Sequence, residues 1–232
     1  MEDVSDTDRP VEFSRARQAV ARRMVDSKRD APHFYASTEL EMDAAVDHVE
    51  KLSASAEGVR VTITAILIRA CAVALREHAR LNAVWGTDGL RLSTEINIGV
   101  AIALDDALVA PAVLDCERLG IPAIAAALQN LVERARHGKL RGREMTDGTF
   151  TLSNLGMFEV SQFTPIVTPP QVAILGAGRI SRLPRFTNGE VVARQLMTVT
   201  VSADHRAVDG VDVARFLGTL KTRIQNPGGL DD

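Results

Sequence analysis

The pattern of residues 96–104 constrains the fold most, because it is typical of a strand that is covered on both faces. Large aliphatic side chains stand at every second position of this segment. The positions between them hold Asn97, Gly99, Ala101 and Ala103, which are small enough to let another layer approach closely. A period of two is the mark of a β-strand. We therefore predict a strand over 96–104, with a helix or a second sheet packed near its small face.

Helical and β patterns mix irregularly along the rest of the chain. Apolar residues at helical spacing predict helices over 14–31, 42–52, 62–78, 121–136 and 209–224, the first of them strongly basic. Strand patterns cover 33–40, 108–114, 149–153, 172–175 and 195–202, and Asn188-Gly189 is a hairpin turn signal. This mixture predicts an α+β fold rather than a doubly wound parallel sheet.

The 232 residues are enough to bury one large core without support from a metal or a disulfide. We expect one domain over 13–232, preceded by a flexible polar arm over 1–12. The 27 Lys and Arg residues nearly balance the 30 Asp and Glu residues, and only 4% of the residues are aromatic. This balance argues against a nucleic-acid partner.

The chain also lacks the patterns of a membrane protein. No apolar run approaches the roughly 20 residues of a membrane span, and the acidic start lacks the apolar stretch of a signal peptide. We therefore expect a cytoplasmic protein with no membrane partner. Cys71 and Cys116 are interpreted as unpaired thiols of the core, with a single disulfide as the alternative that their number allows.

Residues 199–210 carry the strongest signal for chemistry. A predicted strand runs into Asp204, His205 and Arg206, and a predicted helix begins directly after Asp209. The Asp209 carboxylate can cap that helix, so the backbone on both sides of His205 is fixed. A titratable imidazole held in this way suits a general base. The residues alone leave open a purely structural histidine between two carboxylates.

A second segment, residues 147–158, brings Ser153 and Asn154 to the end of a predicted strand, where Gly156 closes a turn. Short hydroxyl and amide side chains at a strand end can donate hydrogen bonds into a pocket. A plain Asx or Ser turn is the alternative interpretation.

Motifs that would indicate a bound nucleotide or metal are missing from the sequence. Gly176-Ala177-Gly178 lacks the third glycine and the following helix of a dinucleotide-binding loop. No cysteines and histidines stand at zinc-binding spacing, and we expect no metal ion.

Together, these segments resemble the catalytic domain of the dihydrolipoamide acyltransferases of 2-oxoacid dehydrogenase complexes, which is similar to chloramphenicol acetyltransferase in fold and chemistry. The resemblance covers residues 13–227. It rests on six blocks, at residues 17–24, 32–34, 96–101, 148–158, 168–176 and 204–210. It implies a chloramphenicol acetyltransferase-like two-layer fold, in which helices flank a mixed β-sheet.

The resemblance also implies a reaction, the transfer of an acyl group between the thiols of dihydrolipoamide and coenzyme A. His205 matches the family's catalytic histidine and would act as general base, and Ser153 matches the hydroxyl that stabilises the oxyanion. Asp209 matches the acidic position four residues after the histidine, and would hold the loop and the ring through Arg17 or Arg206. Arg17 is also a candidate for binding a coenzyme A phosphate, with a solvated helix face as its alternative. Asn154 is a further candidate for contact with substrate.

The family forms trimers in which the histidine comes from one chain and the serine from its neighbour. The implied assembly is a homotrimer or a larger shell. The implied partners are a lipoyl domain, whose lipoyl group another domain or chain would supply, and the dehydrogenase and dihydrolipoamide dehydrogenase components. Coenzyme A would be a co-substrate, and no metal is implied.

The chain departs from the family at three places. About a dozen residues precede the first predicted helix, so we expect either an excised core or a natural stand-alone protein. Glu159 stands where the family commonly has glycine, and Leu230 is followed by two charges where cores often end in a hydrophobic anchor. From this tail we expect a trimer rather than a shell. The alternatives are a stand-alone coenzyme A-dependent acyltransferase for a small hydroxyl or amine, and a non-catalytic trimeric scaffold.

Overall fold

The computed structural model describes residues 12–55, 58–104 and 108–231. Apart from Glu12, the arm predicted over 1–12 lies outside these residues. The helices are α1 (Arg15–Asp30), α2 (Asp43–Ser55), α3 (Ile63–Glu77), α4 (Ile121–Arg136), α5 (Gly142–Thr146) and α6 (Gly210–Gln225). Short 3-10 turns connect them at η2 (Ala79–Leu81), η3 (Cys116–Arg118), η4 (Gly156–Phe158) and η5 (Pro227–Leu230). The strands are β1 (His33–Glu41), β2 (Ala83–Gly86), β3 (Gly89–Leu92), β4 (Ile98–Val100), β5 (Ile102–Ala103), β6 (Leu108–Val109), β7 (Ala112–Val113), β8 (Phe150–Asn154), β9 (Ala173–Thr187) and β10 (Glu190–Asp204).

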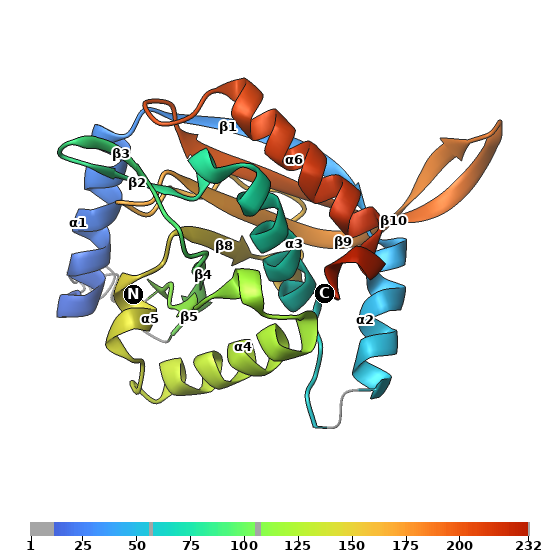
Figure 1. Ribbon diagram of the computed structural model, residues 1–232, viewed down its shortest axis with the longest axis horizontal. Helices are drawn as coiled ribbons and strands as arrows, with labels where there is room; N and C mark the ends of the chain where they lie inside the picture. Colours follow the sequence, from blue (N-terminus) through green and yellow to red (C-terminus); the bar gives the residue numbers. More distant parts are fainter. Residues whose placement is uncertain (1–11, 56–57, 105–107, 232) are drawn as a thin grey trace, which may run out of the picture.

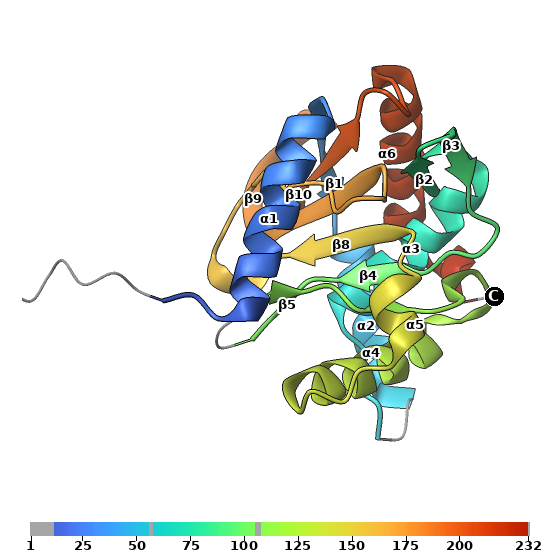
Figure 2. The same cartoon turned by 90° about the vertical axis from the view of Figure 1, so that its left-hand side faces the viewer.

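Six strands form the central sheet, in the order β1-β10-β9-β8-β4-β7 (Figure 1). β8 runs parallel to both of its neighbours, β4 and β9, and the other pairs are antiparallel. Figure 2 shows α1 on one face of this sheet, and α3 with α6 on the other. The predicted α+β class, a mixed sheet flanked by helices, is therefore confirmed.

Helix α3 lies at the centre of the core. Ten of its 15 residues are buried, among them Ile66, Leu67 and Ile68. Thr62 caps the helix, because its side chain accepts a hydrogen bond from the Ala65 N–H at 3.3 Å. The predicted helix that is buried on most of its sides is confirmed.

Two strands were predicted to be continuous, and each prediction is wrong because the structure divides the segment into two short strands. The strand expected over 96–104 is divided into β4 and β5, and β5 leaves the central sheet to pair with β6. The strand expected over 108–114 is divided into β6 and β7. Pro111 lies between these two short strands, and its missing N–H explains the interruption. The layer predicted over the small face does not cover its later part, because Ala101 is half-buried, Ala103 is exposed, and both line a cavity. Gly99 is crowded instead by its own sheet, since a Cβ there would lie only 3.1 Å from the Oγ1 of Thr151 on the paired strand β8.

The last two strands form a hairpin that is longer than predicted. β9 and β10 have 15 residues each, and their turn places Asn188 and Gly189 at φ of 51° and 85°. Two consecutive positive φ angles are those of a type I′ turn, so the turn signal in the sequence is confirmed. The β2–β3 hairpin, which carries Trp85, and the short α5 were not predicted.

Candidate active site

His205 lies directly after β10, at the junction with α6. Its backbone N–H donates to the Pro32 carbonyl at 2.9 Å. Its ring lies 4.6 Å from the ring of Phe34, between ring centres, at an interplanar angle of 49°. The side chain is exposed. The junction therefore fixes the backbone and one face of the imidazole while leaving the ring accessible.

Asp209 caps α6, as the sequence predicts. Its carboxylate accepts hydrogen bonds from the backbone N–H groups of Val211 at 2.8 Å and Asp212 at 3.0 Å. These donors lower the pKa of Asp209, and the nearby His205 lowers it further. The carboxylate thus remains ionised while it holds the first turn of the helix that follows His205.

The predicted link from Asp209 to Arg17 or Arg206 is wrong for the described part of a single chain. Arg206 pairs instead with Asp204, whose carboxylate accepts from the Arg206 backbone N–H and Nε, both at 3.0 Å, and from Nη2 at 2.6 Å. Asp204 is only 2% exposed, and its position two residues before Arg206 makes it the nearer acceptor. The Arg206 guanidinium also lies 4.6 Å from the ring of Trp85. Sequence reasoning missed both contacts.

Arg17 remains apart from the other candidates. Its backbone N–H completes the cap of α1 by donating to Ser14 Oγ at 3.2 Å. Its guanidinium forms no hydrogen bond or ion pair with a described residue, and it lines none of the cavities around the site. α1 reaches the Ser153 cavity through Met24 instead.

Ser153 and Asn154 end β8, as predicted, but they differ in their surroundings. Asn154 Nδ2 donates to Thr64 Oγ1 at 3.2 Å, and its Oδ1 accepts from the Gly156 N–H at 2.9 Å. The Asn154 oxygen thus serves the turn, in line with the alternative interpretation, while its amide nitrogen ties the end of β8 to helix α3. The Ser153 Oγ has no hydrogen-bond partner among the described residues, and it faces a cavity.

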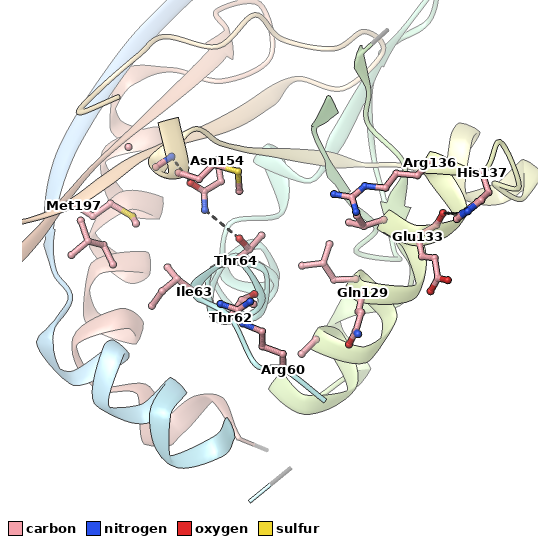
Figure 3. A pocket seen from close by; sticks show the side chains of 17 residues that line it. Arg60, Thr62, Ile63, Thr64, Gln129, Glu133, Arg136, His137, Asn154 and Met197 are labelled. Atoms are coloured by element: carbon pink, nitrogen blue, oxygen red, sulfur yellow. Dashed lines mark hydrogen bonds between the residues drawn. The ribbon is translucent and has the colours of Figure 1, made fainter. Parts of the chain in front are cut away.

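The Ser153 cavity continues into a second, more open groove. The first has a volume of about 600 Å³ and a mainly aliphatic lining, and the groove adds about 920 Å³. Figure 3 shows the groove between α3, α4 and the end of β8, with Arg136 extending from α4 and Arg60 near the start of α3. The two spaces share six lining residues, Thr64, Leu128, Val132, Arg136, Asn154 and Met157. A long ligand can therefore extend from the groove to Ser153.

Ser153 and His205 lie toward opposite edges of the central sheet. Ser153 is level with Gly176 of β9, and Gly176 is level with Thr200 of β10. His205 follows Thr200 by five residues (205 − 200). Five residues are about 17 Å along a strand, and two strand spacings add about 10 Å sideways. Within one chain, these two side chains are too far apart to act on the same atom.

Three further features concern Glu159, metal ligands and membrane spans. Glu159 adopts a left-handed backbone, at φ 60°, and forms an ion pair with Arg179. Within the described residues, no three His, Cys, Asp or Glu side chains lie together as a metal site needs. None of the helices in the same ranges is both long and apolar enough to cross a bilayer.

The chain is similar in sequence to known proteins of one family. The family model described as 2-oxoacid dehydrogenases acyltransferase (catalytic domain) matches residues 5–230. The dihydrolipoyllysine-residue acetyltransferase component of the pyruvate dehydrogenase complex from Rickettsia bellii is 36% identical over 214 residues, which are 91% of this chain and 51% of that protein. The chain thus spans about half the length of the curated relatives it matches.

Solved structures agree with this assignment. The dihydrolipoamide acetyltransferase of Azotobacter vinelandii superposes with a TM-score of 0.92 at 28% identity, over 96% of this chain and 93% of the other. The cubic core of a pyruvate dehydrogenase multienzyme complex gives the same values. Chloramphenicol acetyltransferase shares the fold, with a TM-score of 0.56 at 13% identity over 88% of this chain and 94% of the other. The chain therefore belongs to the 2-oxoacid dehydrogenase acyltransferase family, and the part matched is that family's catalytic domain.

Proposed function

We propose that this chain is an acyltransferase that moves an acyl group between coenzyme A and the thiol of dihydrolipoamide. The active site lies between two copies of the chain, with Ser153 from one protomer and His205 from its neighbour. The observation that carries the proposal is the unpartnered Ser153 hydroxyl in a cavity that no His205 of the same chain can reach. The relatives named as dihydrolipoamide acetyltransferases support the same reaction.

In this reaction, His205 is the general base. It accepts the proton of the attacking thiol, whose sulfur forms a bond to the carbonyl carbon of the thioester. The Ser153 hydroxyl donates a hydrogen bond to the oxyanion of the tetrahedral intermediate. The original carbon–sulfur bond then breaks, and His205 returns its proton to the departing sulfur. Because no described base is hydrogen-bonded to Ser153, we expect no acyl-serine.

The groove beside Ser153 is the place that we assign to coenzyme A. Arg60 and Arg136 bring positive charge to it, and neither is paired with a described carboxylate. The amino-terminal end of α3 adds a partial positive charge. Phosphate groups at one end of coenzyme A would lie near these arginines, and its thiol arm would extend past Asn154 to Ser153. Arg17, the earlier candidate for phosphate binding, has no such support within one chain.

The proposed assembly is a homotrimer, to which another domain or chain supplies the lipoyl group. A ring of copies provides each Ser153 with a neighbour's His205. One solved relative is a cubic core of the pyruvate dehydrogenase complex, so a larger shell with dehydrogenase and dihydrolipoamide dehydrogenase components extends the same proposal. A cytoplasmic location agrees with Cys71 and Cys116, which are buried and unpaired.

The proposal is tested by measuring acetyl-coenzyme A turnover with dihydrolipoamide and with a panel of small alcohols and amines. Turnover with dihydrolipoamide is the expected result. Turnover only with an alcohol or an amine would indicate a different acyltransferase, and no turnover with any acceptor would indicate a scaffold. Either of the last two results would overturn the proposal.

A further inference from the structure

We infer that Trp85, on the β2–β3 hairpin, is a positioning residue for His205 and acts through Arg206. This inference rests on the proposed function, because it assigns His205 the role of the base. Trp85 is the only tryptophan of the chain. No part of the sequence pattern around it points to the site, and its contact with Arg206 appears only in the folded chain.

The first contact that positions His205 is between the two residues on either side of it. Asp204 and Arg206 are joined by four hydrogen bonds with distances of 2.6 to 3.1 Å. The Asp204 N–H donates to the Val172 carbonyl at 2.9 Å, which ties Asp204 to the start of β9. The position of Asp204 is therefore fixed by the sheet, and the Arg206 side chain is bound to the Asp204 carboxylate.

The second contact is with the face of the indole. The Arg206 guanidinium carbon lies 4.6 Å from the Trp85 ring centre, within the range of a cation–π interaction. The Arg206 side chain is 34% exposed, and its hydrogen bonds to Asp204 use only the Nε–Nη2 edge of the planar guanidinium, so that its flat faces are left for other contacts. The indole limits its movement on another side. Without the ring, the guanidinium and the adjoining backbone of His205 gain freedom to move.

The hairpin that carries Trp85 is itself attached to the sheet. The backbone N–H of Trp85 donates to the Pro170 carbonyl at 2.8 Å, and Val84 forms an isolated antiparallel β-bridge with Gln171. Gln171 in turn accepts from Thr151 Oγ1 at 2.6 Å, within β8. The indole is thus connected to β8, the strand that carries Ser153 in the same chain.

His205 is consequently held from two directions. Pro32 and Phe34 of β1 and its preceding loop contact its N–H and its ring, while Trp85 and Arg206 fix the other side of the junction. A base that must meet the thiol of a substrate bound mainly by a neighbouring protomer depends on this geometry. A displacement of about 1 Å can lower a rate by up to about 100-fold.

The experiment compares Trp85→Leu, which removes the aromatic face, with Trp85→Phe, which keeps one. Leu92→Ala serves as the matched control, because Leu92 lies on the same hairpin and is 57% exposed. We expect Trp85→Leu to lose about 10-fold in kcat with an unchanged KM for coenzyme A. Trp85→Phe should keep about half of the wild-type kcat, and Leu92→Ala should match the wild type.

A double-mutant cycle separates positioning from a general loss of structure. Arg206→Met removes the cation without changing the hairpin, so adding Trp85→Leu to it should lower kcat no further. Equal kcat for Trp85→Leu and Trp85→Phe, or independent losses in the cycle, would overturn the inference. If Trp85→Leu does not fold, Trp85→Met, which is also apolar and not aromatic, takes its place in the comparison with Trp85→Phe and in the cycle, with the same loss of about 10-fold expected.

A readout without turnover keeps the inference distinct from the proposed function. Quenching of Trp85 fluorescence by acrylamide should rise about twofold in Arg206→Met, because the stacked guanidinium no longer shields the indole. Unchanged quenching would contradict the contact itself. A wild-type chain without acyltransferase activity but with the expected quenching would contradict the proposed function and leave the contact established.

Discussion

Ser153 and His205 belong to the same sheet but lie toward its opposite edges. The register joins Ser153 to Gly176 and Thr200 across two strand pairs, and His205 comes five residues after Thr200. This separation within one chain is the basis of the proposal that a second copy completes each acyl-transfer site.

Removing the Ser153 hydroxyl should affect the reaction and not the fold. Ser153→Ala should lose about 100- to 1,000-fold in kcat, as expected for one lost oxyanion donor. Its Tm should stay near that of the wild type, because the hydroxyl has no described partner. Steady-state kinetics with thermal unfolding measures both. Ser161→Ala, in the exposed loop that follows, is the control, and a fully active Ser153→Ala would refute the assignment.

Removing positive charge from the groove should weaken binding of coenzyme A. Arg136→Ala should raise the KM for coenzyme A about 10-fold with little change in kcat, because the lost contact is equal in the ground and transition states. The effect should shrink as salt is added. Arg118→Ala removes an equally charged side chain that lines none of the cavities and should leave KM unchanged. An unaltered KM in Arg136→Ala would place coenzyme A outside the groove.

The cap of α6 should make stability depend on pH in a defined direction. The hydrogen bonds from Asp212 and Val211 lower the pKa of Asp209, so its contribution is present above its unfolded pKa of about 4 and is lost as pH falls through the folded value. Asp209→Ala should therefore have a lower Tm than the wild type at neutral pH, and the difference should disappear in acid. Asp209→Asn, which can still cap the helix, should stay close to the wild type. A Tm difference that persists unchanged in acid would contradict this account.

The two cysteines should be unreactive in the folded chain. Burial raises the pKa of both thiols, for Cys116 to about 12, so almost no thiolate is present at neutral pH. Iodoacetamide followed by mass spectrometry should show no labelled Cys71 or Cys116 until denaturant is added. Rapid labelling of the native chain would mean that this part of the core opens.

The junction between β10 and α6 could be predicted from the sequence because its chemistry is local. A strand, a capping aspartate and a helix follow one another, and Asp209 performs the capping role in the structure. The hairpin turn at Asn188 and Gly189 was predictable for the same reason, since one dipeptide determines the backbone.

Contacts between distant parts of the chain could not be read in this way. Trp85 and Arg206 are in contact although they are far apart in sequence. Arg206 forms its ion pair with the buried Asp204 and not with Asp209. The division of residues 96–104 into two strands depends on which neighbours are available, and period two alone contains no information about partners. The groove with Arg60 and Arg136 arises from the packing of α3 beside α4, so no motif marked it.

The central claim, that two copies share each site, is tested most directly by complementation between inactive chains. His205→Ala should lose about 100- to 10,000-fold in rate because the base is removed, and Ser153→Ala about 100- to 1,000-fold because the oxyanion donor is removed. The two variants are co-expressed with different tags, and assemblies that contain both are isolated. His48→Gln, outside the site, is the control for substitution of a histidine.

Each trimer that contains both variants has one interface at which an intact Ser153 meets an intact His205. The account predicts that these mixed trimers recover about one third of the wild-type activity. Mixed trimers as inactive as their two parents would contradict it.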